Sequence, residues 1–284
     1  TLTGSGTAMN LTTGTLNGNL LDINVNAGAG SLTLNTVGGT WSVTNQVDLT
    51  GTTAAFSIAN MPAGGGVTLT GGLNSSLGNG SISLSNNASP VNLGNILLNT
   101  TGSMTVSGST GLTTVTGGSI TTPFNSLLVS NSALAITLGT MTSTGGAGPG
   151  LSATNYTGFI TIASGSITNS NAGFPGVLLS GNAGTFSFGG SVAKVTAGRL
   201  IDISGGTGNV DFSGTLSCLT SCGTGAGVEG LRVTNRTGGT VNFSNATKTF
   251  SSTGANAAIS LTNNAGSTIN FTGGGLAITT TSGT

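Results

Sequence analysis

The chain has 284 residues, 52 of them Gly, and only 4% are charged; five basic and five acidic residues cancel, and there is no His. Ordinary soluble domains are about a quarter charged, so this chain offers no electrostatic footprint for a nucleic acid. Catalysis by a Ser–His or Cys–His pair is excluded, and no apolar run reaches the roughly 18 residues that a transmembrane helix needs.

The N-terminal stretch TLTGSGTAMNL has no positive patch followed by an apolar core, so it is unlike a signal peptide. We therefore expect a processed product or a segment of a longer chain. The even scatter of Val, Ile, Leu and Phe argues against disorder, and the dominance of Gly, Ser, Thr and Asn argues against helix.

Short runs of alternating apolar and polar residues recur along the chain, and this pattern predicts β-strands. The first run of each repeat ends in a turn that is rich in Asn and Gly. These first runs are LLDINV (20–25), NSLLVS (125–130), GVLLS (176–180), RLIDIS (199–204), GLRVT (230–234) and AAISLT (257–262). A second run follows the turn, and a longer, variable connection leads to the next repeat.

The second run carries an apolar anchor residue, which is Phe throughout the last third of the chain. Four phrases share this form: AGTFSFGG (183–190), GTGNVDFSG (206–214), GGTVNFSN (238–245) and GSTINFTG (266–273). The anchors are Phe188, Phe212, Phe243 and Phe271, with weaker copies at Leu34, Leu69, Val106, Leu138 and Ile162. A period of roughly 24 to 31 residues is typical of a solenoid.

The predicted fold is all-β: a right-handed parallel β-helix, or β-solenoid, of about nine to ten coils. We expect a single solenoid over 1–284, irregular in 1–175 and most regular in 176–284. The core residues expected to point inward and stack between coils are Phe188, Val210, Phe212, Val241, Phe243, Ile269 and Phe271. Asp211, Asn242 and Asn270 should point outward, and corner Gly and Asn should adopt positive φ.

The rungs GTGNVDFSG, GGTVNFSN and GSTINFTG resemble those of bacterial extracellular β-helix repeat proteins. Autotransporter passenger domains and filamentous-haemagglutinin-like adhesins are the families meant. The resemblance covers 176–284 well and the preceding residues loosely. It implies a secreted or cell-surface protein that serves adhesion or surface structure. A translocator barrel, a serine-protease domain and a secretion motif are not recognisable in this sequence.

The acidic residues are the candidates for polysaccharide cleavage, which some parallel β-helices perform. They are Asp22, Asp48, Asp202, Asp211 and Glu229. Glycoside hydrolysis needs two carboxyls within roughly 5–10 Å, but a Gly/Asn turn separates Asp202 from Asp211, and Asp22 lies many coils from Asp202. We therefore expect solvated, outward carboxylates and assign no catalytic residue.

No cofactor or metal site is expected either. The stretch GGTGNVDFS (205–213) resembles a calcium-binding nonapeptide, but its Asp comes one residue late and the motif occurs once. A hard cation needs six or more oxygen ligands, which one copy cannot supply.

Cys218 and Cys222 are four residues apart, which is too far for a disulfide in an extended strand but not in a turn. We expect a disulfide because an extracellular location is oxidising; two reduced thiols are the alternative. A metal site on these two residues would lack its other ligands.

The function expected from these observations is a non-enzymatic extracellular β-solenoid that is adhesive, structural or filament-forming. A carbohydrate-binding or carbohydrate-cleaving β-helix is the alternative, for which Trp41 and Tyr156 are the plausible outward aromatic residues. An ice-binding solenoid is a weaker alternative, because Thr does not recur in fixed register. Expected partners are further repeats or copies of the same chain and a host or cell-surface ligand, with no nucleic acid.

Overall fold

The structure is a computed structural model that describes residues 2–4, 7–25, 31–50, 55–76, 78–146, 148–218, 222–223, 228–253 and 256–281. These residues form strands, turns and bends without any helix, and parallel strands stack into a β-solenoid of about 10 turns. The predicted fold class is therefore confirmed. No helix in the described part of the chain could span a membrane.

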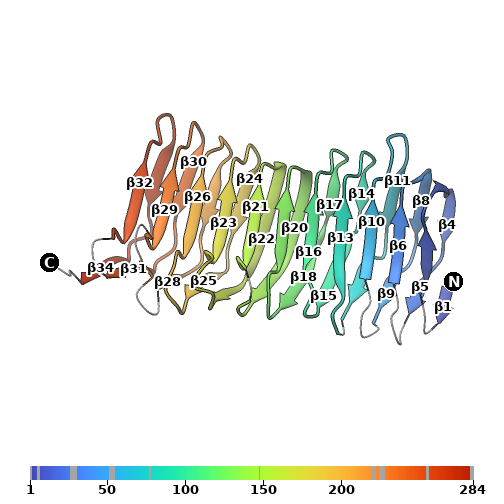
Figure 1. The fold of residues 1–284 in the computed structure, drawn as a ribbon, viewed down its shortest axis with the longest axis horizontal. Coiled ribbons are helices and arrows are strands. Elements are labelled where there is room, and N and C mark those ends of the chain that lie inside the picture. Colours follow the sequence, from blue (N-terminus) through green and yellow to red (C-terminus); the bar gives the residue numbers. More distant parts are fainter. Residues whose placement is uncertain are drawn as a thin grey trace. The chain divides into compact units, whose positions relative to one another are not determined.

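The coils fall into two compact units (Figure 1). Unit 1 comprises Thr1–Thr122 and Ser126–Gly139, and unit 2 comprises Pro123–Asn125 and Thr140–Thr284. Each full coil has three sides, which we name in chain order: the first side lies before the Asn/Gly corner, the second follows it, and the third completes the coil.

In unit 1, each strand pairs in parallel with the strand on the same side of the neighbouring coil. The first side holds β2 (Met9–Leu11), β6 (Ser31–Asn35), β10 (Ala55–Ala59), β13 (Ser81–Ser85), β16 (Met104–Ser107) and β19 (Leu127–Ser130). The second side holds β4 (Gly18–Leu20), β8 (Thr40–Val43), β11 (Gly66–Leu69), β14 (Val91–Asn92), β17 (Thr113–Val115) and the beginning of β20 (Ala133–Ser143). The third side holds β1 (Leu2–Gly4), β5 (Ile23–Val25), β9 (Val47–Leu49), β12 (Leu73–Ser75), β15 (Asn95–Asn99) and β18 (Gly117–Thr122), while β3 (Gly14–Thr15) and β7 (Val37–Gly38) pair separately.

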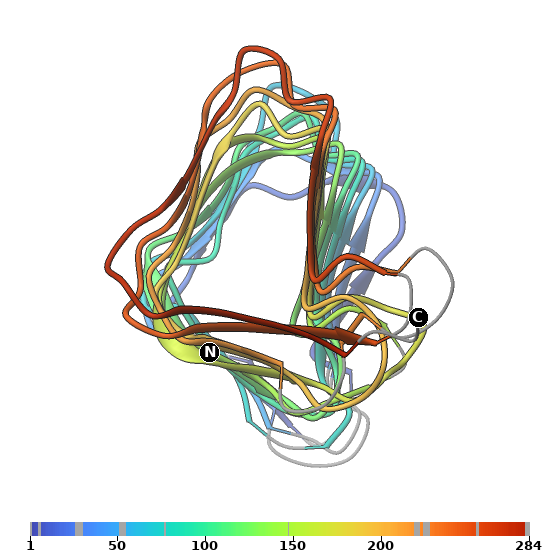
Figure 2. The same ribbon diagram turned by 90° about the vertical axis from the view of Figure 1, so that its left-hand side faces the viewer.

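Unit 2 repeats the arrangement, and Figure 2 shows the three sides of its yellow to red coils. The first side holds β21 (Leu151–Thr154), β23 (Val177–Ser180), β26 (Ile201–Ser204), β29 (Leu231–Thr234) and β32 (Ile259–Thr262). The second side holds β24 (Thr185–Phe188), β27 (Val210–Phe212), β30 (Thr240–Phe243) and β33 (Thr268–Phe271); the third holds β25 (Ser191–Lys194), β28 (Leu216–Cys218), β31 (Lys248–Thr253) and β34 (Leu276–Thr281). The long strand β22 (Thr157–Asn169) runs along both. From β32 through β33 to β34 the chain turns counter-clockwise towards the viewer, so the coil is right-handed.

The core of unit 2 is a column of aromatic side chains on the second side. In register, Phe188 pairs with Phe212, Phe212 with Phe243, and Phe243 with Phe271. The rings of Phe212 and Phe243 stack with centroids 5.8 Å apart, and those of Phe243 and Phe271 with centroids 5.0 Å apart. The structure buries the Phe188, Phe212 and Phe243 side chains completely.

The parallel Val210–Val241–Ile269 column runs beside the rings. Val210 and Val241 are buried, whereas Ile269 on β33 is only half-buried, as is Phe271. Asp211, Asn242 and Asn270 form an outward column between them, in which Asn270 Nδ2 donates to Asn242 Oδ1 over 2.9 Å.

The corner between the first and second sides is built in the same way in the coils from β6 to β32. Its first residue has positive φ and is Thr36, Asn60, Asn86, Gly108 or Asn131 in unit 1 and Asn155, Gly181, Gly205, Asn235 or Asn263 in unit 2. Asn tolerates this left-handed conformation better than most residues. The corner amides also bond between coils: Asn60 Nδ2 donates to Asn35 Oδ1 over 2.9 Å, and Asn263 Nδ2 to Asn235 Oδ1 over 3.2 Å.

Three details of the predicted repeat are wrong. The longer connection contains a strand of its own, the third side, so each coil has three strands and not two. Leu34 and Val106 lie on the first side in β6 and β16, and LLDINV (20–25) contributes to β4 and β5 on the other two sides. Where a side has no Phe, its alternation of apolar and polar residues looks the same as on the other sides. The alternation of the third side is hard to recognise in the sequence, because Lys194, Cys218 and Lys248 occupy buried positions in its strands.

We expect Phe243→Ala to lower the free energy of unfolding by roughly 3–5 kcal/mol, because it leaves a cavity between two stacked rings. Thr272→Ala, at an exposed position that follows β33, should change it by less than about 0.5 kcal/mol. Denaturant titration measures both values. Equal effects would show that the register is wrong.

Candidate functional site

Charged side chains gather on the outer face of the first side of unit 2. Asp202 on β26 and Arg232 on β29 face each other in register. Arg232 donates to both carboxylate oxygens of Asp202, Nε to Oδ1 over 2.9 Å and Nη2 to Oδ2 over 2.7 Å. Such a bidentate pair fixes the geometry of both groups, and its hydrogen bonds raise the pKa of Arg232.

Arg199 and Glu229 extend this pair into a four-residue group, which we call the ion cluster. Arg199 donates to Glu229 Oε2 from Nη2 over 2.8 Å and from Nε over 3.1 Å, and its Nη1 lies 3.5 Å from Asp202 Oδ2. Asp202 is only 4% exposed, so the expectation of a solvated outward carboxylate is wrong for this residue. Two arginines can lie close enough to enclose Asp202 because the coils stack in register.

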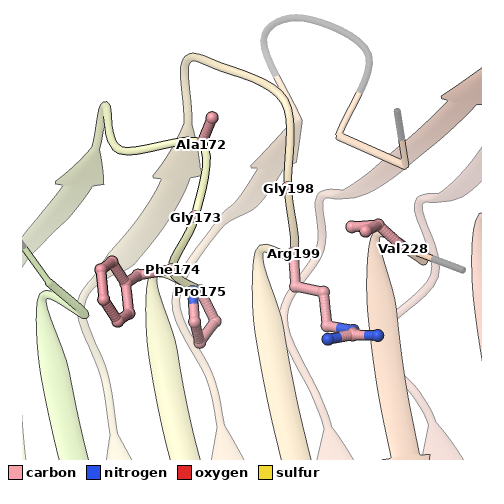
Figure 3. A pocket seen from close by; sticks show the side chains of 7 residues that line it. All are labelled: Ala172, Gly173, Phe174, Pro175, Gly198, Arg199 and Val228. Atoms are coloured by element: carbon pink, nitrogen blue, oxygen red, sulfur yellow. The ribbon is translucent and has the colours of Figure 1, made fainter. Parts of the chain in front are cut away.

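A small hollow adjoins the ion cluster at Arg199. Its volume is about 60 Å³, and its walls are 172–175, Gly198, Arg199 and Val228. Figure 3 shows Phe174 and Pro175 side by side, with Arg199 and Val228 on the following coils. Phe174 is 43% exposed and forms an apolar wall of the hollow, whereas Arg199 forms a charged wall.

A buried ammonium group holds the backbone behind this hollow. Lys194, at the end of β25, is fully buried, and its Nζ donates to Asn169 Oδ1, to the carbonyl of Asn171, and over 2.8 Å to the carbonyl of Phe174. A Cβ on Gly198 would lie 2.6 Å from the carbonyl oxygen of Ala172 and 3.1 Å from Lys194 Cε. Burial lowers the pKa of Lys194 to about 8.

Two further cations occupy comparable places inside unit 2. The Lys248 ammonium donates to the carbonyls of Asn245, Thr272 and Gly274, and the Arg236 guanidinium donates to those of Gly205, Gly208 and Gly238. Both side chains are buried, and burial lowers both pKa values.

Sequence reasoning missed these cations. The signal that could have found Lys194 and Lys248 is their place in the alternation, where an apolar residue is expected.

The two cysteines form a disulfide. Cys218 ends β28, and the Cα atoms of Cys218 and Cys222 are 5.7 Å apart. The backbone N–H of Gly198 donates to the carbonyl of Cys222 over 2.7 Å. Cys222 therefore lies one coil beyond Gly198.

The aromatic residues do not lie where the carbohydrate alternative needs them. Trp41 is 2% exposed and Tyr156 is fully buried, so neither is the outward ring that the carbohydrate alternative requires. Both occupy inward positions, Trp41 on β8 and Tyr156 directly after the corner residue Asn155. The exposed rings in the described residues are instead Phe124, Phe159 and Phe174.

The chemistry open to the ion cluster is that of a static, self-neutralising group. Asp202 and Glu229 each accept hydrogen bonds from Arg, so protein groups already occupy both carboxylates. Ligand pockets usually measure roughly 300–1,000 Å³, so a hollow of about 60 Å³ has no room for a sugar ring.

The described residues contain no group of three or more His, Cys, Asp or Glu side chains that could hold a metal ion. Asp211, the acid of the nonapeptide-like stretch, faces outward and accepts a hydrogen bond from Ser244 Oγ over 3.4 Å.

Comparison with known proteins adds no relative. No family model matches the sequence, and neither a curated protein nor a solved structure matches it.

We expect the protein to become more stable as the pH rises from 7 to 9.5. The Lys194 pKa is about 8 in the folded chain and about 10.5 in the unfolded chain, so between these values the unfolded chain binds more protons. Integrated to pH 9.5, this one residue contributes about 2 kcal/mol, and Lys248 acts in the same direction.

The measurement is urea unfolding at several pH values. It should stop below pH 10, because burial raises the pKa of Tyr156 and reverses the trend once tyrosine ionises in the unfolded chain. Lys194→Met should remove much of the rise. A rise of the same size in this variant would assign the pH dependence to other groups.

Proposed function

We propose that this chain is a non-enzymatic extracellular solenoid with an adhesive or structural role at a cell surface. One observation carries the proposal: the outer faces carry ladders of uncharged polar side chains that bond from coil to coil. Ser204 Oγ donates to Ser180 Oγ over 3.0 Å, and Thr234 and Thr262 share a hydrogen bond of 3.0 Å. Such faces are rigid and repetitive, and they present few groups for acid–base chemistry.

The use of charge supports the same proposal. Lys194, Arg236 and Lys248 are buried, and the ion cluster neutralises itself. The Cys218–Cys222 disulfide supports an extracellular location, because disulfides persist in oxidising compartments. The resemblance of the Phe rungs to adhesin repeats points the same way, whereas the small hollow speaks against a carbohydrate-cleaving role.

A surface-display experiment tests this function. Residues 1–284 are displayed on a non-adherent bacterium, and attachment to host cells and protease resistance are measured. An adhesive role predicts attachment that is lost when Thr234→Asp and Thr262→Asp change the outer face, while protease resistance stays. A structural role predicts a protease-resistant surface layer without attachment. Phe243→Ala is the unfolding control, and release of reducing sugar ends from polysaccharides by the purified chain would contradict the proposal.

Self-association is the second part of the proposal. Leu276 and Ile278 on β34 pair in register with Lys248 and Phe250, which are fully buried, yet they are themselves 43% and 53% exposed. The sequence after Lys248 has no charged residue, and charge is the usual guard of a strand edge. A further coil or a second copy of the chain packed on β34 would bury these side chains.

Sedimentation velocity over a concentration series tests the association. We expect the average mass to rise with concentration and Leu276→Lys with Ile278→Lys to reduce the rise. Leu97→Lys is the matched control, because Leu97 is 42% exposed on the outer face of β15 in unit 1. A monomer at every concentration, or equal effects of the control, would refute association through β34.

A further inference from the structure

A buried amine lies against a side-chain amide on the third side of unit 2. Lys194, the last residue of β25, is in register with Asn169, the last residue of β22. Lys194 is 0% exposed and Asn169 is 1% exposed, and the Lys194 Nζ lies 2.5 Å from Asn169 Oδ1. An amine and a carboxamide can condense to an amide cross-link. Here the fold holds the two groups together, which removes the entropic cost of bringing them into contact.

The protonation state of Lys194 decides whether it can react, because only the neutral amine is a nucleophile. Burial lowers the pKa of Lys194 from 10.5 to about 8. About a tenth of the molecules therefore carry the neutral amine at pH 7, and about half carry it at pH 8. An exposed lysine would be almost fully protonated at both pH values.

The hydrogen bonds around the Lys194 Nζ decide where its lone pair points. The ammonium form donates to three oxygens, which are Asn169 Oδ1, the carbonyl of Asn171 and, over 2.8 Å, the carbonyl of Phe174. The neutral amine keeps two protons, and the two backbone carbonyls can accept both. The lone pair then takes the place of the third N–H, so it is directed at the carboxamide of Asn169.

The backbone holds and polarises the Asn169 carboxamide. Its Oδ1 also accepts from the backbone N–H of Asn171 over 3.1 Å, and its Nδ2 donates to the carbonyl of Gly148 over 3.0 Å. A backbone N–H on this oxygen stabilises the negative charge that develops there when a nucleophile adds to the amide carbon. A single neutral donor gives modest help, so we expect a slow reaction.

We propose that Lys194 and Asn169 form an intramolecular amide bond in the folded chain. The Lys194 Nζ adds to Asn169 Cγ, and Oδ1 carries the charge that develops. One proton then passes from Nζ to Nδ2, the Cγ–Nδ2 bond breaks, and ammonia leaves. The Nζ–Cγ bond replaces the Cγ–Nδ2 bond, so atoms and charge balance without a co-reactant. The product joins two consecutive coils covalently. This inference goes beyond the proposed function and does not depend on it.

Mass spectrometry of the whole chain tests the bond. Freshly purified chain is held folded at pH 9 and 37 °C, and its mass should fall by the mass of one ammonia molecule. Chain kept unfolded in guanidinium chloride should not lose this mass. Chymotrypsin cleaves after Phe174, which lies between the two residues, yet a digest of the denatured product should contain the Asn169 peptide joined to the Lys194 peptide. Trypsin should no longer cleave after Lys194.

The pH profile distinguishes this amine from an ordinary lysine. Because the pKa of Lys194 is about 8, the initial rate of ammonia loss should be about tenfold higher at pH 9 than at pH 7 and should change little above pH 9. A chain that has lost ammonia should also lack the contribution of Lys194 to the pH dependence of unfolding, because its amine has become an amide.

One variant and one control complete the test. Asn169→Asp keeps the shape of the side chain but replaces the amide with a carboxylate, so it should lose no ammonia from this site. Asn270→Asp, on the outer face of β33, should lose it at the rate of the unmodified chain. Circular dichroism checks that both fold, and peptide mapping of the unmodified chain decides the matter even where Asn169→Asp does not fold. An unchanged mass after about two weeks at pH 9, a cross-link between other residues, or an undiminished loss in Asn169→Asp would each overturn the proposal.

Discussion

The parallel register is the constraint on which the rest of this structure depends. Each side chain has its counterparts in the neighbouring coils as its nearest partners, so a residue is acceptable only if it suits the same position one coil away. The Phe column follows this rule by matching ring with ring, and two corner positions follow it by placing Gly next to Asn. A Cβ on Gly108 would lie 2.3 Å from Asn86 Oδ1, and one on Gly181 would lie 2.0 Å from Asn155 Oδ1. Gly therefore stands where the preceding coil has placed an amide in the available space.

The same constraint explains why cations lie inside a nearly uncharged protein. At the corners the strand ladder is interrupted, and backbone carbonyls there accept hydrogen bonds from these buried cations. A buried carbonyl needs a donor, and an ammonium or guanidinium group supplies several at once. Burial lowers the pKa values of Lys194, Lys248 and Arg236, so the interior disfavours their charge. We infer that they are placed there for the hydrogen bonds, and that their charge is a cost the corner carbonyls offset.

The fold was predictable from the sequence because stacking converts a local pattern into a global one. The alternation around Phe212 and Phe243 fixes which residues point inward, and repetition fixes what they meet. The third side could not be found in this way, since Lys194 and Lys248 stand where an apolar residue would have revealed the alternation. The ion cluster was equally hidden: Asp202 and Arg232 are 30 residues apart in sequence, and their contact depends on the length of the intervening loop. Within the candidate site, only the closeness of Cys218 and Cys222 could be read from spacing.

Gly18 differs from other inward glycines in what a side chain at its position would meet. At Gly206, the residue after the corner, a Cβ would lie 2.3 Å from the carbonyl oxygen of Asn182, so close backbone approach accounts for the glycine. At Gly118 the same test finds the carbonyl oxygen of Ile96 at 1.8 Å. Gly18 has φ +145°, which a side chain rarely adopts, but no atom lies near its missing Cβ. Backbone conformation therefore accounts for the glycine. The carbonyls that lie close at Gly206 and Gly118 belong to the preceding coil, whereas β4 pairs with β8 on the following coil. Register thus restricts a residue only through the coils that stack against it.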